Sequence, residues 1–111
     1  MDAAAYRKML DRSLVSAGNT ARLASAVARA RSGEPVTLAF VGGSITEGYN
    51  ASEADRSYAR LFHREFAARY GANGGGNVAY RNAGMAGTPS TLGMIRYRRD
   101  VTGENGRAPD V

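Results

Sequence analysis

The 111-residue sequence contains no cysteine, and lysine and histidine occur once each, as Lys8 and His63. Without cysteine, the chain has no disulfide framework, no thiolate metal ligand and no cysteine nucleophile. No apolar run approaches the roughly 20 residues of a membrane span, and the first residues lack the basic segment and apolar run of a signal peptide. If Met1 is the true start, we expect a cytoplasmic protein with no membrane partner.

The charge is unbalanced, because fifteen basic residues face ten acidic ones and give a net charge of +5. Such a balance can indicate an anionic partner. The arginines are, however, spread along predicted helices, and no aromatic residues alternate with them in a pattern suited to stacking bases. We interpret them as solvated helix faces and expect no nucleic-acid binding; they are Arg22, Arg29, Arg31, Arg60, Arg64, Arg69, Arg96, Arg98 and Arg99.

The strongest local pattern lies at residues 36–48. Residues 36–41 are apolar or β-branched and uncharged, as in a strand buried on both faces of a parallel sheet. Gly42 and Gly43 are expected to bend the chain through conformations closed to residues with a Cβ. This turn presents Ser44 at a strand's carboxyl end, where ligands bind in open α/β sheets. Ser44 is therefore a candidate nucleophile or phosphate contact, or it caps the helix that follows.

Two helices are predicted before this strand. Residues 2–10 form a short one, which residues 13–18 end. A second begins after Thr20 and ends before Gly33. Its apolar positions recur at helical spacing and form one stripe, composed of Leu23, Val27 and Ala30.

The region after the first glycine turn predicts a βαβ unit. Residues 49–57 form an exposed loop, residues 58–70 an amphipathic helix, residues 71–77 a flexible loop and residues 78–81 a second strand. A helix between two strands implies a parallel pair with a right-handed crossover. The helix should pack on the sheet through Tyr58, Leu61, Phe62, Phe66 and Tyr70.

A second turn rich in small residues, 82–90, follows the second strand, so both turns should lie at the same edge of the sheet. Ser90 or Thr91 is expected to cap a third helix that runs to about Val101. Its inward residues should be Leu92, Met94 and Ile95. Residues 103–109 then form a loop, and Asp110 and Val111 begin a third strand.

The predicted fold class is α/β, with the chain forming one domain. Two strands would leave one edge of the first strand open, and such an edge is prone to aggregation. We therefore expect residues 1–111 to be the N-terminal part of a single larger domain.

The order of these motifs resembles a known family. A strand, Gly-Gly-Ser-Ile-Thr-Glu-Gly, an amphipathic helix, a strand and Asn-Ala-Gly-Met-Ala-Gly-Thr-Pro-Ser resemble the first half of the SGNH (GDSL-type) hydrolases, especially their carbohydrate-esterase-like members. The resemblance covers about residues 14–111. It implies a flavodoxin-like three-layer α/β/α sandwich and a cofactor-independent serine esterase that removes small acyl groups, such as acetyl, from carbohydrate. A Walker A loop and a Gly-x-Ser-x-Gly elbow fit the first block less well.

The resemblance also implies roles for individual residues. Ser44 corresponds to the nucleophile, and its backbone N–H belongs to the oxyanion hole. Gly87 supplies a second oxyanion N–H and, lacking a side chain, admits the substrate oxygen. Gly43 and Thr88 correspond to substrate-binding positions, although Thr88, like Ser90, can instead simply begin the third helix. Gly43 departs from the common GDSL sequence motif, which has aspartate at this position.

Two of the family's four catalytic sequence blocks are not found in these residues. Neither a Gly-x-Asn-Asp-like block nor an Asp-x-x-His block is present. His63 is expected on the exposed helix face opposite Phe62 and Phe66, and one histidine without cysteine offers no metal-ligand spacing. A serine without a base is a poor nucleophile, so the chain alone should be a poor catalyst.

Several polar residues near the turns remain open to two interpretations. Glu47, Glu53 and Asp55 solvate the first loop, or Glu47 supports the turn or caps the helix. Asn82 hydrogen-bonds across the two turns or forms a turn of its own. The alternative to an esterase is a noncatalytic module that holds an anion or a sugar between the glycine turns.

Overall fold

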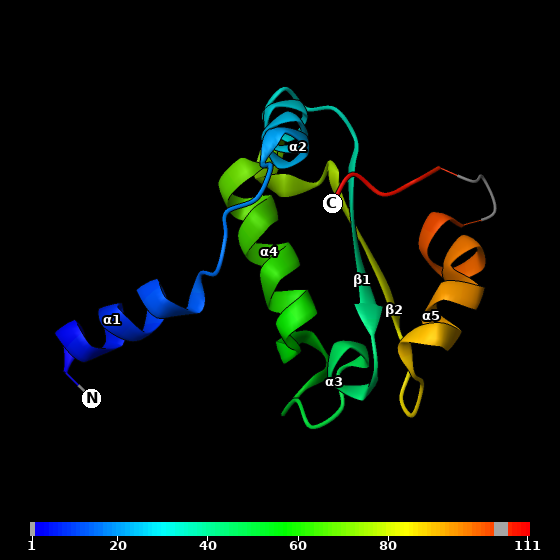
Figure 1. Cartoon of the computed structure of the whole chain (residues 1–111). Coiled ribbons are helices and arrows are strands. Elements are labelled where there is room, and N and C mark those ends of the chain that lie inside the picture. Colours follow the sequence, from blue (N-terminus) through cyan, green and yellow to red (C-terminus); the bar gives the residue numbers. More distant parts are fainter. Residues whose placement is uncertain (1, 104–106) are drawn as a thin grey trace.

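The computed structural model describes residues 2–103 and 107–111, and it places helices on both sides of a two-stranded sheet (Figure 1). The elements in chain order are α1 (Ala3–Ser13), α2 (Ala21–Arg31), β1 (Val36–Gly42), α3 (Ser44–Glu47), η1 (Ala54–Arg56), α4 (Tyr58–Tyr70), η2 (Asn73–Gly75), β2 (Val78–Gly84), α5 (Ser90–Tyr97) and η3 (Arg98–Thr102). None of the described helices is long and apolar enough to cross a membrane. Of the loop predicted at 103–109, residues 104–106 lie outside the described residues.

The sheet confirms the α/β prediction. Strands β1 and β2 pair in parallel, in a register that runs from Val36 opposite Val78 to Gly42 opposite Gly84. The second strand is longer than predicted, because residues 82–84 continue the pairing with β1 where a turn was expected. The small residues of this segment therefore belong partly to the strand and partly to the turn after it.

The core lies between one face of the sheet and the helices α2 and α4. It is formed mainly by small or aliphatic side chains: Ala26, Ala30, Val36, Leu38, Phe66, Ala67 and Val78. The predicted packing of the helix at residues 58–70, α4, on the sheet is confirmed only in part. Tyr58, Leu61 and Phe62 remain about half exposed, because the apolar arc of α4 is wider than the two described strands cover.

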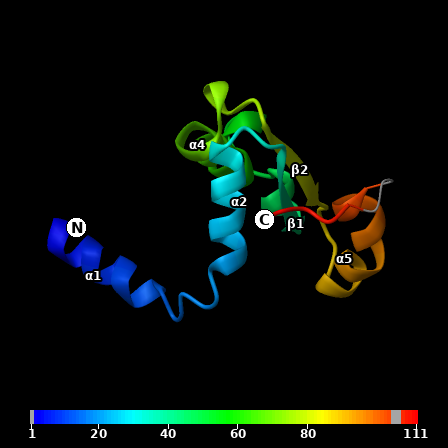
Figure 2. The same cartoon turned by 90° about the horizontal axis from the view of Figure 1, so that it is seen from above.

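Helix α5 lies on the opposite side of the strands from α2 (Figure 2). Its buried residues are Gly93 and Arg96, whereas Met94 and Ile95 are 74% and 77% exposed. The predicted inward face is therefore wrong. Gly93 faces β1 closely, since a Cβ built on it would lie 3.6 Å from a methyl carbon of Val41. Because Gly93 is the residue of α5 on the β1 side, the side chains of Met94 and Ile95 project away from the sheet.

The start of α5 and the placement of α1 also differ from expectation. Pro89 occupies the N-cap position of α5 and no side chain caps the helix, so the predicted Ser90 or Thr91 cap is wrong. Helix α1 extends to Ser13, three residues beyond the prediction, and buries none of its residues. Figures 1 and 2 show α1 standing apart from the sheet.

A pair of glycines lets α3 sit directly on the ends of the strands. Gly42 and Gly84 are opposite each other at the last position of the pairing. A Cβ on Gly84 would lie 2.7 Å from the carbonyl carbon of Thr46, and a Cβ on Gly42 would lie 2.8 Å from the Thr46 Cβ. Real Cβ contacts are not this short, so both positions require glycine for space.

The expected conformational role of the first two turn glycines is thus wrong. Gly43 has a φ of −89°, and Gly42 is not among the residues with positive φ. The left-handed residue of this turn is Gly48, whose φ of 119° ends α3. Gly42 is needed because α3 occupies the space where its side chain would be.

Asp110 ties the end of the chain to β1 and α2. Its carboxylate accepts from the Arg29 guanidinium at 2.6 Å and from the Thr37 N–H at 2.8 Å. Burial raises the pKa of Asp110, but these two donors outweigh burial and hold that pKa below its ordinary value of 3.8. Ionised Asp110 therefore stabilises the fold.

We predict that Gly84→Ala destabilises the protein by about 2 kcal/mol or more, because the new methyl group meets backbone atoms of α3 that cannot rotate away. Chemical denaturation of the two proteins measures the difference. Gly76→Ala is the matched control, since nothing lies within 4 Å of its Cβ position and its φ is −63°. Equal effects of the two substitutions would show that α3 is not seated as described.

We predict that Asp110→Ala lowers the free energy of unfolding by about 2 kcal/mol at pH 7, since it removes two hydrogen bonds to a charged acceptor. Because the folded-state pKa is depressed, this contribution is present above about pH 4 and is lost as the pH falls through the folded-state value. Urea titrations between pH 2 and pH 7 test it, with exposed Asp11→Ala as the control. A difference that does not shrink in acid would contradict the assignment.

Candidate active site

The turns that follow β1 and β2 meet at one edge of the sheet, as predicted. The Met85 N–H donates to the Gly42 carbonyl at 3.0 Å. The Ala86 N–H donates to Glu47 Oε2 at 2.7 Å, so Glu47 supports the turn. These contacts hold the backbones of the two turns in a fixed relation, and the turns contain Ser44, Gly87 and Thr88.

Asn82 joins the two turns from within the strand. Its Nδ2 donates to the Thr46 carbonyl at 2.7 Å and to the Tyr80 hydroxyl at 2.9 Å, while its Oδ1 accepts from the Gly84 N–H at 2.8 Å. The predicted bond across the turns is confirmed. Because these contacts occupy both ends of the amide, Asn82 serves to position the turns.

Thr46 is the anchor of the first turn, and the sequence analysis did not assign it this role. It is 7% exposed, and its hydroxyl shares a 2.8 Å hydrogen bond with the Tyr58 hydroxyl. Tyr58 begins α4, so the turn is held by that helix as well as by β2. Thr46 and Asn82 are polar residues next to strand ends, which is the one sequence signal that could have suggested their contact.

The hydroxyl of Ser44 is not used for capping. Ser44 is the first residue of α3, the N-cap position belongs to Gly43, and no side chain caps the helix. The capping interpretation of Ser44 is therefore wrong. Its carbonyl accepts from the N–H groups of Gly48 and Tyr49 at 3.0 and 2.8 Å, which fixes its backbone.

Ser44 is partly exposed. Among the residues that the structure describes, none forms a hydrogen bond with the Ser44 hydroxyl. The side chain is thus a free hydroxyl on a rigid backbone, at the carboxyl end of a strand. Its predicted role as a nucleophile stays a prediction.

Gly87 lies in the second turn with a φ of 70°. A Cβ at this position would meet nothing within 4 Å, so the surrounding protein leaves room for a side chain. Glycine is favoured here by the left-handed backbone conformation. The Thr88 hydroxyl donates to the Met85 carbonyl at 2.7 Å and so closes this turn.

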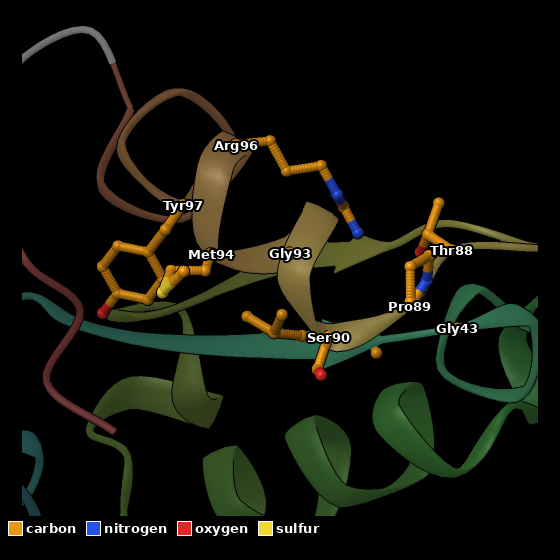
Figure 3. A pocket seen from close by; sticks show the side chains of 10 residues that line it. Gly43, Thr88, Pro89, Ser90, Gly93, Met94, Arg96 and Tyr97 are labelled. Atoms are coloured by element: carbon orange, nitrogen blue, oxygen red, sulfur yellow. The ribbon is translucent and has the colours of Figure 1, made fainter.

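A groove of about 520 Å³ runs from the turns along β1 and beneath α5 (Figure 3). Gly43, Thr88 and Ser90 line its end near the turns, whereas Ser44 and Gly87 are not part of its wall. The structure thus brings the two predicted substrate-binding positions to one cavity. Ser90 also begins α5, and contact of Thr88 or Ser90 with a substrate stays a prediction.

His63 does not lie at this edge. Its Nε2 is 2.8 Å from the carbonyl oxygen of Val78, and its ring centre is 5.2 Å from that of Tyr80. Val78 begins the seven-residue strand β2, about 20 Å of strand from Gly84. The predicted exposure of His63 is wrong, because its face of α4 turns toward β2, where the ring finds a backbone partner.

The remaining acidic residues of the first loop are solvated, which is the first of the two interpretations given for them. Glu53 and Asp55 are largely exposed and lie 3.5 and 3.8 Å from Arg56 and Arg64. Within residues 2–103 and 107–111, no group of three or more histidine, aspartate or glutamate side chains could hold a metal ion.

No protein-family model matches the chain, and no curated protein matches it significantly. Among solved structures, it is similar to a two-domain esterase (CEX) active on acetylated mannans, with 32% sequence identity, a TM-score of 0.71 and coverage of 78% of this chain. The same esterase co-crystallised with mannopentaose gives 33% identity, a TM-score of 0.70 and 76% coverage. In both cases, this chain spans 22% of the other. The chain therefore has an α/β fold similar to that of a carbohydrate esterase.

Proposed function

We propose that this chain carries the nucleophile and part of the oxyanion hole of an SGNH-type serine esterase that deacylates carbohydrate. The observation that carries the proposal is the free Ser44 hydroxyl on a rigid backbone where the two turns meet. The similarity to an esterase active on acetylated mannans supports the reaction class.

The proposed chemistry uses groups from both turns. Ser44 Oγ attacks the ester carbonyl carbon as its proton passes to a base, and the carbonyl oxygen becomes an oxyanion. The N–H groups of Ser44 and Gly87 stabilise that charge, and their value lies in being positioned before it develops. The intermediate collapses to an acyl-enzyme and releases the alcohol, which takes up the proton. Water then attacks the acyl-enzyme, giving the acid and free Ser44.

The base is the part that the described residues do not provide. The His63 ring is hydrogen-bonded to the Val78 carbonyl, at the end of β2 away from Ser44. A serine hydroxyl needs an adjacent base to react at a useful rate. We propose that residues 1–111 form the N-terminal part of a larger domain, and that the base and a further oxyanion donor belong to its remainder. The chain alone should then hydrolyse esters poorly.

The substrate class rests on two observations. The similar esterase acts on acetylated mannans. Ser44 is partly exposed and Gly87 is exposed, so the described residues do not enclose a substrate placed on them. An acetylated carbohydrate is therefore our proposed substrate, while the polysaccharide's identity stays open to experiment.

We predict that Ser44→Ala in the complete protein lowers turnover of an acetyl ester by at least about 10⁴-fold while leaving the melting temperature unchanged. The physical reason is that the hydroxyl supplies the nucleophile and makes no hydrogen bond to the described residues. Steady-state hydrolysis of 4-nitrophenyl acetate measures turnover. Ser25→Ala, at an exposed serine of α2, is the matched control. A Ser44 variant with full turnover would end the assignment.

We predict that Gly87→Val lowers kcat by about 10² to 10³-fold and changes KM much less, because the isopropyl group displaces an N–H that acts on charge in the transition state. Valine is also strained at a φ of 70°, so Gly87→Asn is needed beside it, since asparagine tolerates this conformation. Gly87→Asn should retain more kcat than Gly87→Val. An effect confined to KM would remove Gly87 from the oxyanion hole.

A further inference from the structure

A second cavity, of about 340 Å³, lies on the other side of the two turns from the groove beneath α5. Its walls come from α3, the loop before α4, the first turn of α4 and β2, and it shares no lining residue with that groove. Figure 1 shows α3 and the start of α4 side by side at the end of the sheet where the turns lie. We call it the α4-side cavity.

Glu47 connects this cavity to the candidate active site. Ser44 and Glu47 are the first and last residues of α3, and side chains three apart in a helix begin about 5–6 Å from each other. Glu47 Oε2 also accepts from the Ala86 N–H, next to Gly87 in the second turn. The α4-side cavity thus starts within one helical turn of the proposed nucleophile, a separation comparable to the width of one pyranose ring.

Two hydrogen-bond donors in the cavity wall are unused. The Arg60 guanidinium lies over the Tyr80 ring, with its central carbon 4.6 Å from the ring centre, and this stacking restrains the planar group. It forms no side-chain hydrogen bond or ion pair with the residues that the structure describes. The Tyr80 hydroxyl accepts from Asn82 Nδ2 at 2.9 Å, and its own proton has no acceptor among the same residues.

Two acceptors in the wall are unused as well. Only Oε2 of Glu47 is occupied by the Ala86 N–H, so its second oxygen is free within the described part of the chain. Asp55 is 59% exposed, and its carboxylate lies 3.8 Å from an Arg64 nitrogen, which is too far for a hydrogen bond. The cavity therefore offers donors and acceptors together.

This mixture of groups selects one class of ligand. A sugar hydroxyl donates and accepts at once, so neighbouring hydroxyls can pair with the carboxylates and with the Arg60 and Tyr80 donors. A phosphate or carboxylate ligand offers only acceptors at neutral pH and would be repelled by Glu47 and Asp55. An apolar ligand would remove all four groups from water without replacing their hydrogen bonds.

We propose that the α4-side cavity is a subsite for a neutral sugar unit, which adjoins the acylated unit placed at Ser44. Hydroxyls of this sugar donate to Glu47 and Asp55 and accept from Arg60 and Tyr80. The assignment of the sugar to the substrate rests on the proposed function, whereas binding itself requires no ester hydrolysis. The subsite would make the enzyme favour esters on an oligosaccharide chain over short esters without a sugar.

The test titrates the complete protein with mannopentaose, cellopentaose and xylopentaose in a calorimeter. We expect at least one of them to bind, and Asp55→Asn and Arg60→Met each to raise its Kd by about fivefold or more. Glu53→Gln and Arg56→Met are the matched controls, because these two exposed side chains lie 3.5 Å apart in the same loop and do not line the cavity. The controls should change Kd by less than about twofold.

A kinetic measurement separates the subsite from the proposed function. We expect Asp55→Asn and Arg60→Met to lower the ratio of kcat/KM for the acetylated pentasaccharide to kcat/KM for 4-nitrophenyl acetate by about fivefold or more, because only the first substrate carries a sugar chain. Full turnover by Ser44→Ala would remove the proposed function and leave the binding result intact. Unchanged Kd values in both cavity variants would remove the subsite and leave the assignment of Ser44 intact.

Three further results would overturn the subsite. The first is that none of the three pentasaccharides binds. The second is that the Glu53 and Arg56 controls weaken binding as much as the cavity variants do. The third is tighter binding of pentagalacturonic acid than of every neutral pentasaccharide, which would make the cavity an anion site.

Discussion

The packing of α3 on the last residues of both strands is the constraint on which the rest of the candidate site depends. Gly42 and Gly84 leave the space that this packing requires, and Thr46 fills it. Once α3 is seated, the Thr46 carbonyl and hydroxyl meet Asn82 and Tyr58. The strand ends, α3 and the start of α4 are then one rigid unit, with Ser44 at its surface.

This arrangement explains why two distant segments can act as one site. The first turn contains the short helix α3, and the second has no helix of its own before α5, so specific polar contacts join the two turns. Glu47 accepts from the second turn, and the Gly42 carbonyl accepts from Met85. Ser44 and Gly87 lie in the turns that these contacts join, and the oxyanion role that we propose for their N–H groups requires those groups to be aimed in advance.

The sequence predicted what depends on local pattern and turn chemistry. The apolar run at residues 36–41 and the amphipathic helix at 58–70 indicated the parallel unit, and the glycine turns indicated a shared edge of the sheet. The predictions that were wrong concern contacts between residues that lie far apart in the sequence. The space restriction at Gly84 comes from α3, which follows the other strand, and the face that α5 turns toward β1 is the one that carries Gly93 beside Val41. The position of His63 was missed because helical spacing cannot show that the Val78 carbonyl lies beside it.

The central claim is that Ser44 is the nucleophile of an esterase. The most direct measurement reacts the protein purified from its native cells with a fluorophosphonate and maps the adduct by mass spectrometry, because only a serine activated by a base should react. Our account predicts one stoichiometric adduct, on Ser44. Failure of Ser44 to react, or an adduct on another serine, would contradict it and favour a module that binds its ligand without catalysis.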